Sequence, residues 1–350
     1  MADIEDRLAE LLDQETFEPD PAFVATALDT THEQPADWVA FWAQQARELG
    51  WISEPTKALD DSGAPFYTWF EDGTLNASYN CVDRHVEAGN GDRVAYHWHG
   101  EQGETRTITY ADLHRDVQRF ANALKSEGVR AGDVVGIFLP MIPEVVVAML
   151  ACARIGAIHN VVFGGFAAES VAERMEFSDA KLLICADEGR RKGKTAPVKA
   201  AIDELVGELP CIVVRNTGGA CPMAAKDRWY HELLEAAESE CPPEELGAEH
   251  PLFILYTSGS TAKPKGILHT TGGYLTGAAW THKHVFDLKP DSDVYWCSAD
   301  VGWITGHTYI VYGPLLNGAT SVMWEGGPDY PHRGIWWELC ERYGVTLFYT

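Results

Sequence analysis

Residues 255–266 read Leu-Tyr-Thr-Ser-Gly-Ser-Thr-Ala-Lys-Pro-Lys-Gly, and this stretch says most about the fold and chemistry of the chain. An apolar run precedes it, hydroxyl and glycine residues fill its middle, and two lysines flank a proline near its end. A strand that leads into such a loop offers backbone N–H groups, hydroxyl donors and ammonium charges to a single anion, as a phosphate requires. The loop lacks the spacing of the common Gly-x-x-x-x-Gly-Lys-Ser/Thr loop, and the alternative interpretation is a Ser/Gly-rich surface turn. The candidate phosphate-binding residues are Thr257, Ser258, Gly259, Ser260, Thr261, Lys263, Lys265 and Gly266.

Short apolar segments alternate with helical patterns through the middle of the chain. The spacing predicts a helix from Thr109 to about Gly128, with its apolar residues on one side, and a second helix at 144–155. Strands are predicted at 134–139, 158–163, 181–185 and 211–215. An earlier helix is predicted from residues that are spaced to share one face, Trp38, Phe41, Trp42 and Leu49. Strands that alternate with helices indicate an α/β fold in which mainly parallel sheets are flanked by helices.

The two ends of the chain differ from this pattern. Residues 1–35 are expected to form an acidic leader, with a short helix at 4–12. Residues 36–106 are expected to be an N-terminal segment that packs on the main domain, which follows as residues 107–350. Because residues 343–350 read as an apolar strand with no polar tail, the sequence predicts that the main domain is truncated at its C-terminus.

The composition is that of a packed and strongly acidic protein. Apolar residues make up 46% of the chain, which contains 12 tryptophans, and this argues against disorder. With 52 acidic and 27 basic residues the formal charge is -25, so nucleic acids and anionic membranes are not expected as partners. Abundant carboxylates with few lysines favour a halophilic source, and an ordinary acidic mesophilic protein is the alternative.

Signals for export and for metal binding are missing from the sequence. The first 20 residues hold eight carboxylates against one arginine, which is unlike a secretory signal. Prolines and charges interrupt the most apolar stretch, 134–157, so a membrane span is not predicted and a cytoplasmic protein is expected. The eight cysteines include no C-x-x-C pair, and His282-x-His284 has no further ligands at suitable spacing, so no metal site is predicted.

Several blocks of the sequence resemble a known family. Together with residues 267–274, the candidate phosphate loop is similar to the phosphate loop of the AMP-forming acyl-CoA synthetases. Residues 296–309 (WCSADVGWITGHTY), 76–85 (NASYNCVDRH) and 149–166 resemble the acetate–CoA ligases of that family, and the similarity covers nearly all of the chain from Trp38 onward. The resemblance implies the large N-terminal domain of the adenylate-forming enzyme fold, incomplete here. The small C-terminal domain would lie beyond residue 350 with the family's lysine, which leaves the catalytic residue unassigned.

The resemblance also implies roles for particular residues. The phosphate loop would bind the β- and γ-phosphates of ATP, with Mg2+ as their counterion, although the family usually has glycine where this chain has Ala262. Ile304 and Thr305 lie where the family lines its small acyl pocket, and the family usually has valine in place of Ile304. The residues that would bind coenzyme A are Arg191, Lys192, Gly193, Lys194, Thr305 and Asp329. Lys194 replaces a family arginine and Asp329 a family asparagine. A solvated charged face is the alternative interpretation of this basic cluster.

The resemblance therefore predicts the N-terminal part of an acetate–CoA ligase, which forms acetyl-CoA from acetate, ATP and coenzyme A through acetyl-AMP. A pocket discriminates weakly against one extra methylene, so a ligase for propionate or another short-chain acid is an alternative. A second alternative is a non-catalytic half-length protein that binds nucleotide or coenzyme A, or that pairs with a separately encoded C-terminal half. The 350 residues alone are predicted to be inactive, because the family's adenine- and ribose-binding parts lie beyond them.

Overall fold

The computed structural model describes three stretches of the chain, residues 19–28, 35–257 and 264–350. The helix expected at 4–12 and six residues of the candidate phosphate loop, 258–263, lie outside the described residues.

The chain separates into two compact units, residues 1–34 and residues 35–350. In the first unit the described part contains one short helix, α2 (Pro21–Val24), which is capped by Asp20 because its carboxylate accepts a hydrogen bond of 2.7 Å from the backbone N–H of Ala22. All elements below belong to the second unit.

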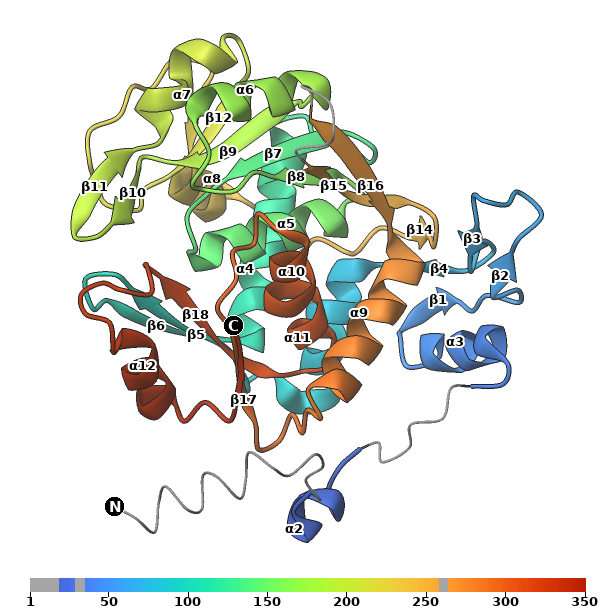
Figure 1. Cartoon of the computed structure of the whole chain (residues 1–350). Coiled ribbons are helices and arrows are strands. Elements are labelled where there is room, and N and C mark those ends of the chain that lie inside the picture. The colour runs from blue at the N-terminus through green and yellow to red at the C-terminus, as the bar shows by residue number, and fades with distance from the viewer. Residues whose placement is uncertain (1–18, 29–34, 258–263) are drawn as a thin grey trace, which may run out of the picture. The chain divides into compact units, whose positions relative to one another are not determined.

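The larger sheet alternates with helices along the chain (Figure 1). Among the described residues it has seven strands, in the order β13 (Arg228–Trp229), β12 (Cys211–Val214), β9 (Leu182–Ala186), β7 (Val134–Phe138), β8 (Ile158–Val161), β15 (Pro251–Thr257) and β16 (Lys265–Thr270). Every neighbouring pair is parallel except β15 and β16. The central strands are buried on both faces, so their sequences read as short apolar runs. The predicted mainly parallel sheet is confirmed.

A second sheet and three smaller strand groups complete the β-structure. In the described part of the chain the second sheet has five strands, in the order β19 (Leu347–Tyr349), β17 (Val294–Cys297), β18 (Thr320–Glu325), β5 (Val94–Gly100) and β6 (Thr105–Thr109). Only its pair of β5 and β6 is antiparallel. The smaller groups are β1 (Trp51–Ser53) with β4 (Thr74–Leu75) and β14 (Leu246–Gly247), β2 (Leu59–Asp60) with β3 (Thr68–Trp69), and β10 (Glu188–Arg191) with β11 (Lys194–Pro197).

Helices cover both faces of the larger sheet. The helices in the described part of the second unit are α3 (Trp38–Ala46), α4 (Tyr110–Ser126), α5 (Pro143–Arg154), α6 (Ala168–Phe177), α7 (Lys199–Val206), α8 (Tyr230–Ala236), α9 (Thr271–Val285), α10 (Ile304–Gly306), α11 (Gly313–Leu316) and α12 (Ile335–Tyr343), with π-helical turns η1 (Tyr79–Asp83), η2 (Val86–Asn90) and η3 (His307–Tyr312). Alternate residues of β9 separate two cores, because Leu183 packs in the cluster that contains α6 and α7, whereas Leu182 packs in the cluster that contains α4 and α5. None of the helices in the described stretches is long and apolar enough to cross a membrane.

The sequence signals at the ends of α4 correspond to its observed caps. The side-chain oxygen of Thr109 accepts a hydrogen bond of 3.1 Å from the backbone N–H of Asp112, and the carboxylate of Asp112 accepts one from the backbone N–H of Thr109. The helix ends at Ser126, shortly before Gly128, which has a φ of 87°. The helix predicted from Thr109 to about Gly128 is confirmed.

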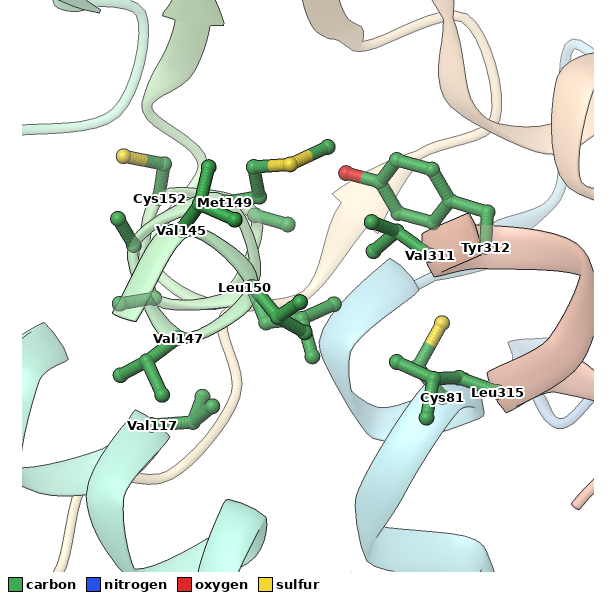
Figure 2. Close-up of a cluster of buried hydrophobic side chains, with 14 of the residues drawn as sticks. Cys81, Val117, Val145, Val147, Met149, Leu150, Cys152, Val311, Tyr312 and Leu315 are labelled. Carbon is green, nitrogen blue, oxygen red and sulfur yellow. The ribbon is translucent and has the colours of Figure 1, made fainter. Parts of the chain in front are cut away.

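Helix α5 lies at the centre of the larger core. Figure 2 shows its side chains directed around the whole helix, with Val147 facing Val117 of α4 and Leu150 directed toward the segment that carries Val311 and Leu315. Each of these side chains is buried. A helix that is apolar on all sides is stable only when other elements surround it, so α5 joins the sheet to the segment after the second sheet's β17.

The helix predicted from Trp38, Phe41, Trp42 and Leu49 is shorter than expected. It ends at Ala46, so Leu49 does not share its face; Leu49 is buried instead by the turn that follows. Two of the aromatic residues, Phe41 and Trp42, pack edge to face against Trp280 of α9.

Candidate functional site

The candidate phosphate loop joins the ends of β15 and β16. Their register places Thr257 opposite Lys265 and Tyr256 opposite Gly266, so the loop begins and ends at one edge of the larger sheet. At that edge the parallel strands β8 and β15 both end, which is where open α/β sheets bind ligands. Thr257, Lys265 and Gly266 are exposed there. The remaining candidates, Ser258, Gly259, Ser260, Thr261 and Lys263, lie outside the described residues, as does Ala262.

Gly266 has a specific steric reason to be glycine. A Cβ atom at this position would lie 3.2 Å from side-chain atoms of both Ile254 and Tyr256, which is closer than ordinary van der Waals contact. The absence of a side chain lets β16 lie close to β15 directly after the loop.

A group of aromatic residues lies close to the same strand ends. The ring of Trp303 is 5.5 Å from that of Phe163, which follows β8, and 6.2 Å from that of Phe166. The guanidinium of Arg174 lies 4.6 Å from the Phe166 ring and 5.8 Å from the ring of Tyr256, at the end of β15. These contacts bring the segments after β8 and β17 together near Tyr256, at the end of the strand that leads into the candidate phosphate loop.

The two candidate acyl-pocket residues follow Trp303 in α10. Ile304 is 45% exposed and Thr305 is partly buried. Other residues in the described part of the chain therefore cover the Ile304 side chain only in part. Gly302 is required before them, because a Cβ atom there would lie 2.4 Å from the backbone of Phe163. Asp300 precedes this turn and accepts a hydrogen bond of 2.8 Å from the backbone N–H of Gly302. Burial raises the pKa of Asp300 to about 6.

Three histidines near these segments form part of the core. The ring of Phe253 stacks on His269 at 4.4 Å and lies 4.7 Å from His307, while His159 and the Tyr312 hydroxyl are joined by a hydrogen bond of 2.7 Å. Burial lowers the pKa of His307 to about 4 and that of His159 well below its usual range, so both rings are neutral at pH 7. His269 and His307 thus both pack against the ring of Phe253. No group of three metal-ligating side chains converges within the described stretches.

The basic cluster at 190–194 forms an exposed β-hairpin. Strands β10 and β11 pair Arg191 with Lys194 across a two-residue turn of Lys192 and Gly193, whose φ angles are 52° and 75°. Two positive φ angles in a two-residue loop are typical of a type I′ turn. Arg191 and Lys194 therefore project from paired positions at the tip of the hairpin, and both are exposed.

The loop that carries Asp329 contacts this hairpin. The ammonium of Lys192 lies 2.8 Å from the Asp329 carboxylate, and the side chain of Tyr330 lies so close to Gly193 that a Cβ atom there would be 2.2 Å from the Tyr330 hydroxyl. The ion pair with Lys192 lowers the pKa of Asp329 through its hydrogen bond. The structure thus brings together Arg191, Lys192, Gly193, Lys194 and Asp329. No hydrogen bond or ion pair in the described part of the chain joins Thr305 to them.

Three acidic residues of this region were not singled out from the sequence. Both carboxylate oxygens of Glu101 accept hydrogen bonds from the hairpin turn, Glu104 pairs with Arg190 at 2.9 Å, and buried Glu325 accepts a hydrogen bond from Asn216. They come from the second sheet, so their partners are remote in sequence. No local pattern could have identified them.

One cavity beside the larger sheet has the wrong charge for a phosphate ligand. It has a volume of about 520 Å³, lies between α6 and α7, and is lined by four carboxylates, those of Glu169, Glu173, Glu176 and Asp179. Repulsion between these carboxylates and phosphate makes this cavity unsuitable for an anionic ligand.

Comparisons with known proteins agree with this arrangement. A family model described as AMP-binding enzyme matches residues 82–350, and one described as acetyl-coenzyme A synthetase N-terminus matches residues 30–81. The acetyl-coenzyme A synthetases of Streptomyces avermitilis and Streptomyces coelicolor are each 56% identical to this chain over 352 residues, covering 98% of this chain and 54% of the relative. The relative from Thiobacillus denitrificans is 52% identical over 365 residues, covering 100% of this chain and 55% of the relative.

The chain thus spans about half the length of the curated relatives it matches. The matched family models cover the α/β domain and the segment that precedes it. The chain belongs to the AMP-binding enzyme family, in which it corresponds to an N-terminal portion of the AMP-forming acetyl-coenzyme A synthetases.

Proposed function

We propose that this chain provides the substrate-binding surface of a ligase that forms acetyl-CoA from acetate, ATP and coenzyme A. The observation that carries the proposal is the strand pair β15–β16, whose register sets Thr257 and Lys265 at the two ends of the candidate phosphate loop. Contacts through Arg174 and Phe166 connect Tyr256, at the end of β15, with Trp303, which precedes the acyl-pocket candidates. We place the protein in the cytoplasm, where acetate, ATP and coenzyme A are all available.

In the first step an acetate oxygen attacks the α-phosphorus of ATP, which forms acetyl-AMP and releases pyrophosphate. The loop at 257–266 would hold the β- and γ-phosphates, with Mg2+ as their counterion. Hydroxyls, backbone N–H groups and the Lys263 and Lys265 ammonium groups would neutralise the charge that develops on the leaving pyrophosphate. Positioning and charge neutralisation therefore supply the catalysis, and no side-chain base is needed, because acetate is already ionised at pH 7.

In the second step the thiolate of coenzyme A attacks the carbonyl carbon of acetyl-AMP, which forms the thioester and releases AMP. The hairpin cations Arg191 and Lys194 would bind the phosphates at the nucleotide end of coenzyme A. Asp329 pairs with the ammonium of Lys192, and Glu101 accepts a hydrogen bond from its backbone N–H, so Lys192 would contribute less to the ligand than Arg191 and Lys194. The paired positions of Arg191 and Lys194 suit a ligand with several phosphate oxygens.

Ile304 and Thr305 would limit the length of the acid. A branched apolar side chain at 304 leaves room for a methyl group and disfavours longer chains, although one methylene changes the binding free energy of the transition state by only about 1–3 kcal/mol. We therefore expect acetate to be preferred over propionate by about tenfold to a hundredfold in kcat/KM. Equal values for the two acids would favour the alternative of a general short-chain ligase.

The test of this function joins the chain to the C-terminal half of the Streptomyces coelicolor relative, which is 56% identical over the matched region. The fusion should form acetyl-CoA in the presence of acetate, ATP, Mg2+ and coenzyme A, and should catalyse acetate-dependent exchange of pyrophosphate into ATP. The chain alone should show neither activity, because the relatives are about twice as long. Acetate-dependent consumption of coenzyme A by the chain alone would contradict the proposal that a second half is needed.

The second half could be part of the same polypeptide or a separate partner. An immunoblot of the source cells distinguishes the two, because a band near 38.6 kDa indicates a separate partner, whereas a band near twice that mass indicates a single longer ligase. A stable short protein with no such partner would favour a non-catalytic nucleotide- or CoA-binding function.

A further inference from the structure

The turn of the basic hairpin is held from the second sheet by a single carboxylate. Glu101 lies after β5 and is only 3% exposed. One of its oxygens accepts a hydrogen bond of 2.7 Å from the backbone N–H of Lys192, and the other accepts one of 2.8 Å from the backbone N–H of Gly193. Such charge-assisted hydrogen bonds are stronger than those between neutral groups.

The turn conformation explains why a carboxylate fits there. In a two-residue turn with positive φ at both positions, the two central N–H groups are not used by the strand ladder and point toward the same side. Successive N–H groups of this kind form a concave anion-binding nest. Glu101 occupies the nest, and its two hydrogen bonds offset the steric cost of holding the non-glycine Lys192 in the left-handed region.

The remaining charges of the hairpin are distributed unequally. Arg190 pairs with Glu104, and Lys192 pairs with Asp329. Arg191 and Lys194 form no ion pair with any residue in the described stretches, and both are exposed. Arg190 and Lys192 are therefore neutralised within the protein, whereas the two cations at paired positions beside the turn have no acidic partner among the described residues.

We propose that Glu101 is a positioning residue of the coenzyme A site, which clamps the hairpin turn so that Arg191 and Lys194 are held in place for the ligand's phosphates. The proposal rests on the proposed binding of coenzyme A at this hairpin. Glu101 itself does not touch the ligand, since its carboxylate is buried behind the turn. By holding the turn in one conformation before coenzyme A binds, Glu101 would lower the conformational entropy that the hairpin loses on binding.

Two variants distinguish the hydrogen bonds of Glu101 to the turn from the general effect of removing a negative charge near the hairpin. In Glu101→Gln the side chain keeps its size, but an NH2 group replaces one oxygen and faces an N–H donor of the turn. Glu104→Gln is the matched control, because it removes the same charge from the same loop while both turn N–H groups keep their acceptor. Arg191→Ala tests the binding of coenzyme A directly.

The experiment measures hydrogen exchange of the Lys192 and Gly193 amides by mass spectrometry, together with the affinities of the whole chain for coenzyme A and for ATP. Glu101→Gln should speed up exchange at both amides at least tenfold and weaken coenzyme A binding about five- to thirtyfold, with ATP affinity unchanged. Glu104→Gln should change each of these less than threefold. A purely structural role would lower both affinities together, and that result would overturn the proposal.

Three further outcomes distinguish the positioning role of Glu101 from the proposed function. Unchanged exchange in Glu101→Gln would overturn the clamp, even if Arg191→Ala abolishes coenzyme A binding. Faster exchange with unchanged affinity, while Arg191→Ala still abolishes binding, would overturn the positioning role. If Arg191→Ala leaves the coenzyme A affinity unchanged, the proposed site itself fails and its positioning residue fails with it.

Discussion

The buried pair of Asp83 and Arg154 and the exposed β10–β11 hairpin use the same charged groups in opposite ways. Arg154 is 1% exposed and donates two hydrogen bonds of 2.8 Å to the two oxygens of Asp83, and its third nitrogen donates to the backbone of Cys241. At the hairpin tip, Arg191 and Lys194 have no acidic partner among the described residues. The first arrangement is closed and stabilises the fold. The second is open and leaves its charge available to a ligand.

The pKa of Asp83 reflects the closed arrangement. Burial alone would raise it, but hydrogen bonds from His114 and Arg154 outweigh burial and lower the pKa of Asp83 to about 2. A buried charge is thus tolerated where its partners are complete. The predictions below test that contrast.

Arg154→Met should have the largest effect on stability. It leaves the Asp83 carboxylate buried without its main partner, which costs about 3–5 kcal/mol of unfolding free energy. Urea denaturation of the chain measures the loss. Arg115→Met is the control, since it removes an arginine from an exposed pair with Asp112 and Asp116 and should cost less than about 1 kcal/mol. Equal losses in the two variants would contradict the contrast between closed and open sites.

Acid should destabilise the chain through histidines that are buried without a charged partner. The pKa of His307 is about 4 and that of His282 about 3 in the folded protein, because burial disfavours their charged forms, whereas the unfolded value is 6.5. Their contribution is complete above pH 6.5 and is lost as the pH falls toward 4, since the unfolded state then binds protons that the folded state excludes. Each histidine should cost about 2 kcal/mol between pH 6.5 and pH 5.

Denaturation curves at pH 7, 6 and 5 test this expectation, with His307→Phe as the matched variant. The variant should lose less stability on acidification than the parent chain. The paired carboxylate of Asp83 does not obscure the result, because its contribution is lost only below about pH 4. Parallel pH profiles for the two proteins would rule out His307 as a source of acid sensitivity.

Glu325→Gln should have an effect of the opposite sign. Burial raises the pKa of Glu325 to about 7, from an unfolded value of 4.5, and one of its oxygens has no hydrogen-bond partner among the described residues. The folded state therefore binds the carboxyl proton of Glu325 more tightly than the unfolded state does. Stability is lost as the pH rises from 4.5 through 7. The difference between a pKa of about 7 and one of 4.5 corresponds to about 3 kcal/mol, so the variant should be more stable than the parent by about that amount at pH 8 and within about 1 kcal/mol of it at pH 5. Thermal unfolding at the two pH values checks the difference, which should vanish if Glu325 ionises normally.

Asp329→Asn should have the smallest effect on stability. The pair with Lys192 is about half exposed, so its loss should change the unfolding free energy by less than about 1 kcal/mol. Releasing the Lys192 ammonium and removing a carboxylate near the ligand phosphates should strengthen coenzyme A binding about two- to threefold. Calorimetric titration measures this change, and weaker binding by the variant would indicate that Asp329 assists the ligand instead.

The sequence was sufficient to predict the elements whose signals are local. The caps and apolar face of α4, and the buried strands of the larger sheet, arise from burial that repeats with the period of each element, so they can be read in one stretch. Leu49 was misassigned, because its spacing fitted a helix that ends three residues earlier. Tertiary burial of Leu49 produces the same apolar signal as a helix face would.

The residues that contact the hairpin turn from other parts of the chain, Glu101 and Asp329, could not be predicted in this way. Glu101 and Lys192 are separated by 91 residues, and a glutamate between two glycines reads as part of a surface turn. Only the pairing of β5 with β18 brings this loop to the hairpin, together with the loop that carries Asp329. The roles of the exposed residues in the phosphate loop, the acyl pocket and the hairpin stay predictions that depend on the resemblance.

Calorimetric titration of coenzyme A into the chain and into the Arg191→Ala/Lys194→Ala double variant tests the central claim most directly. The account predicts that the double variant binds coenzyme A at least about tenfold more weakly, because two charge-assisted contacts are lost, while its melting temperature stays within about 1 °C of the parent. Equal affinities in two equally stable proteins would contradict the claim that the open hairpin is the coenzyme A site.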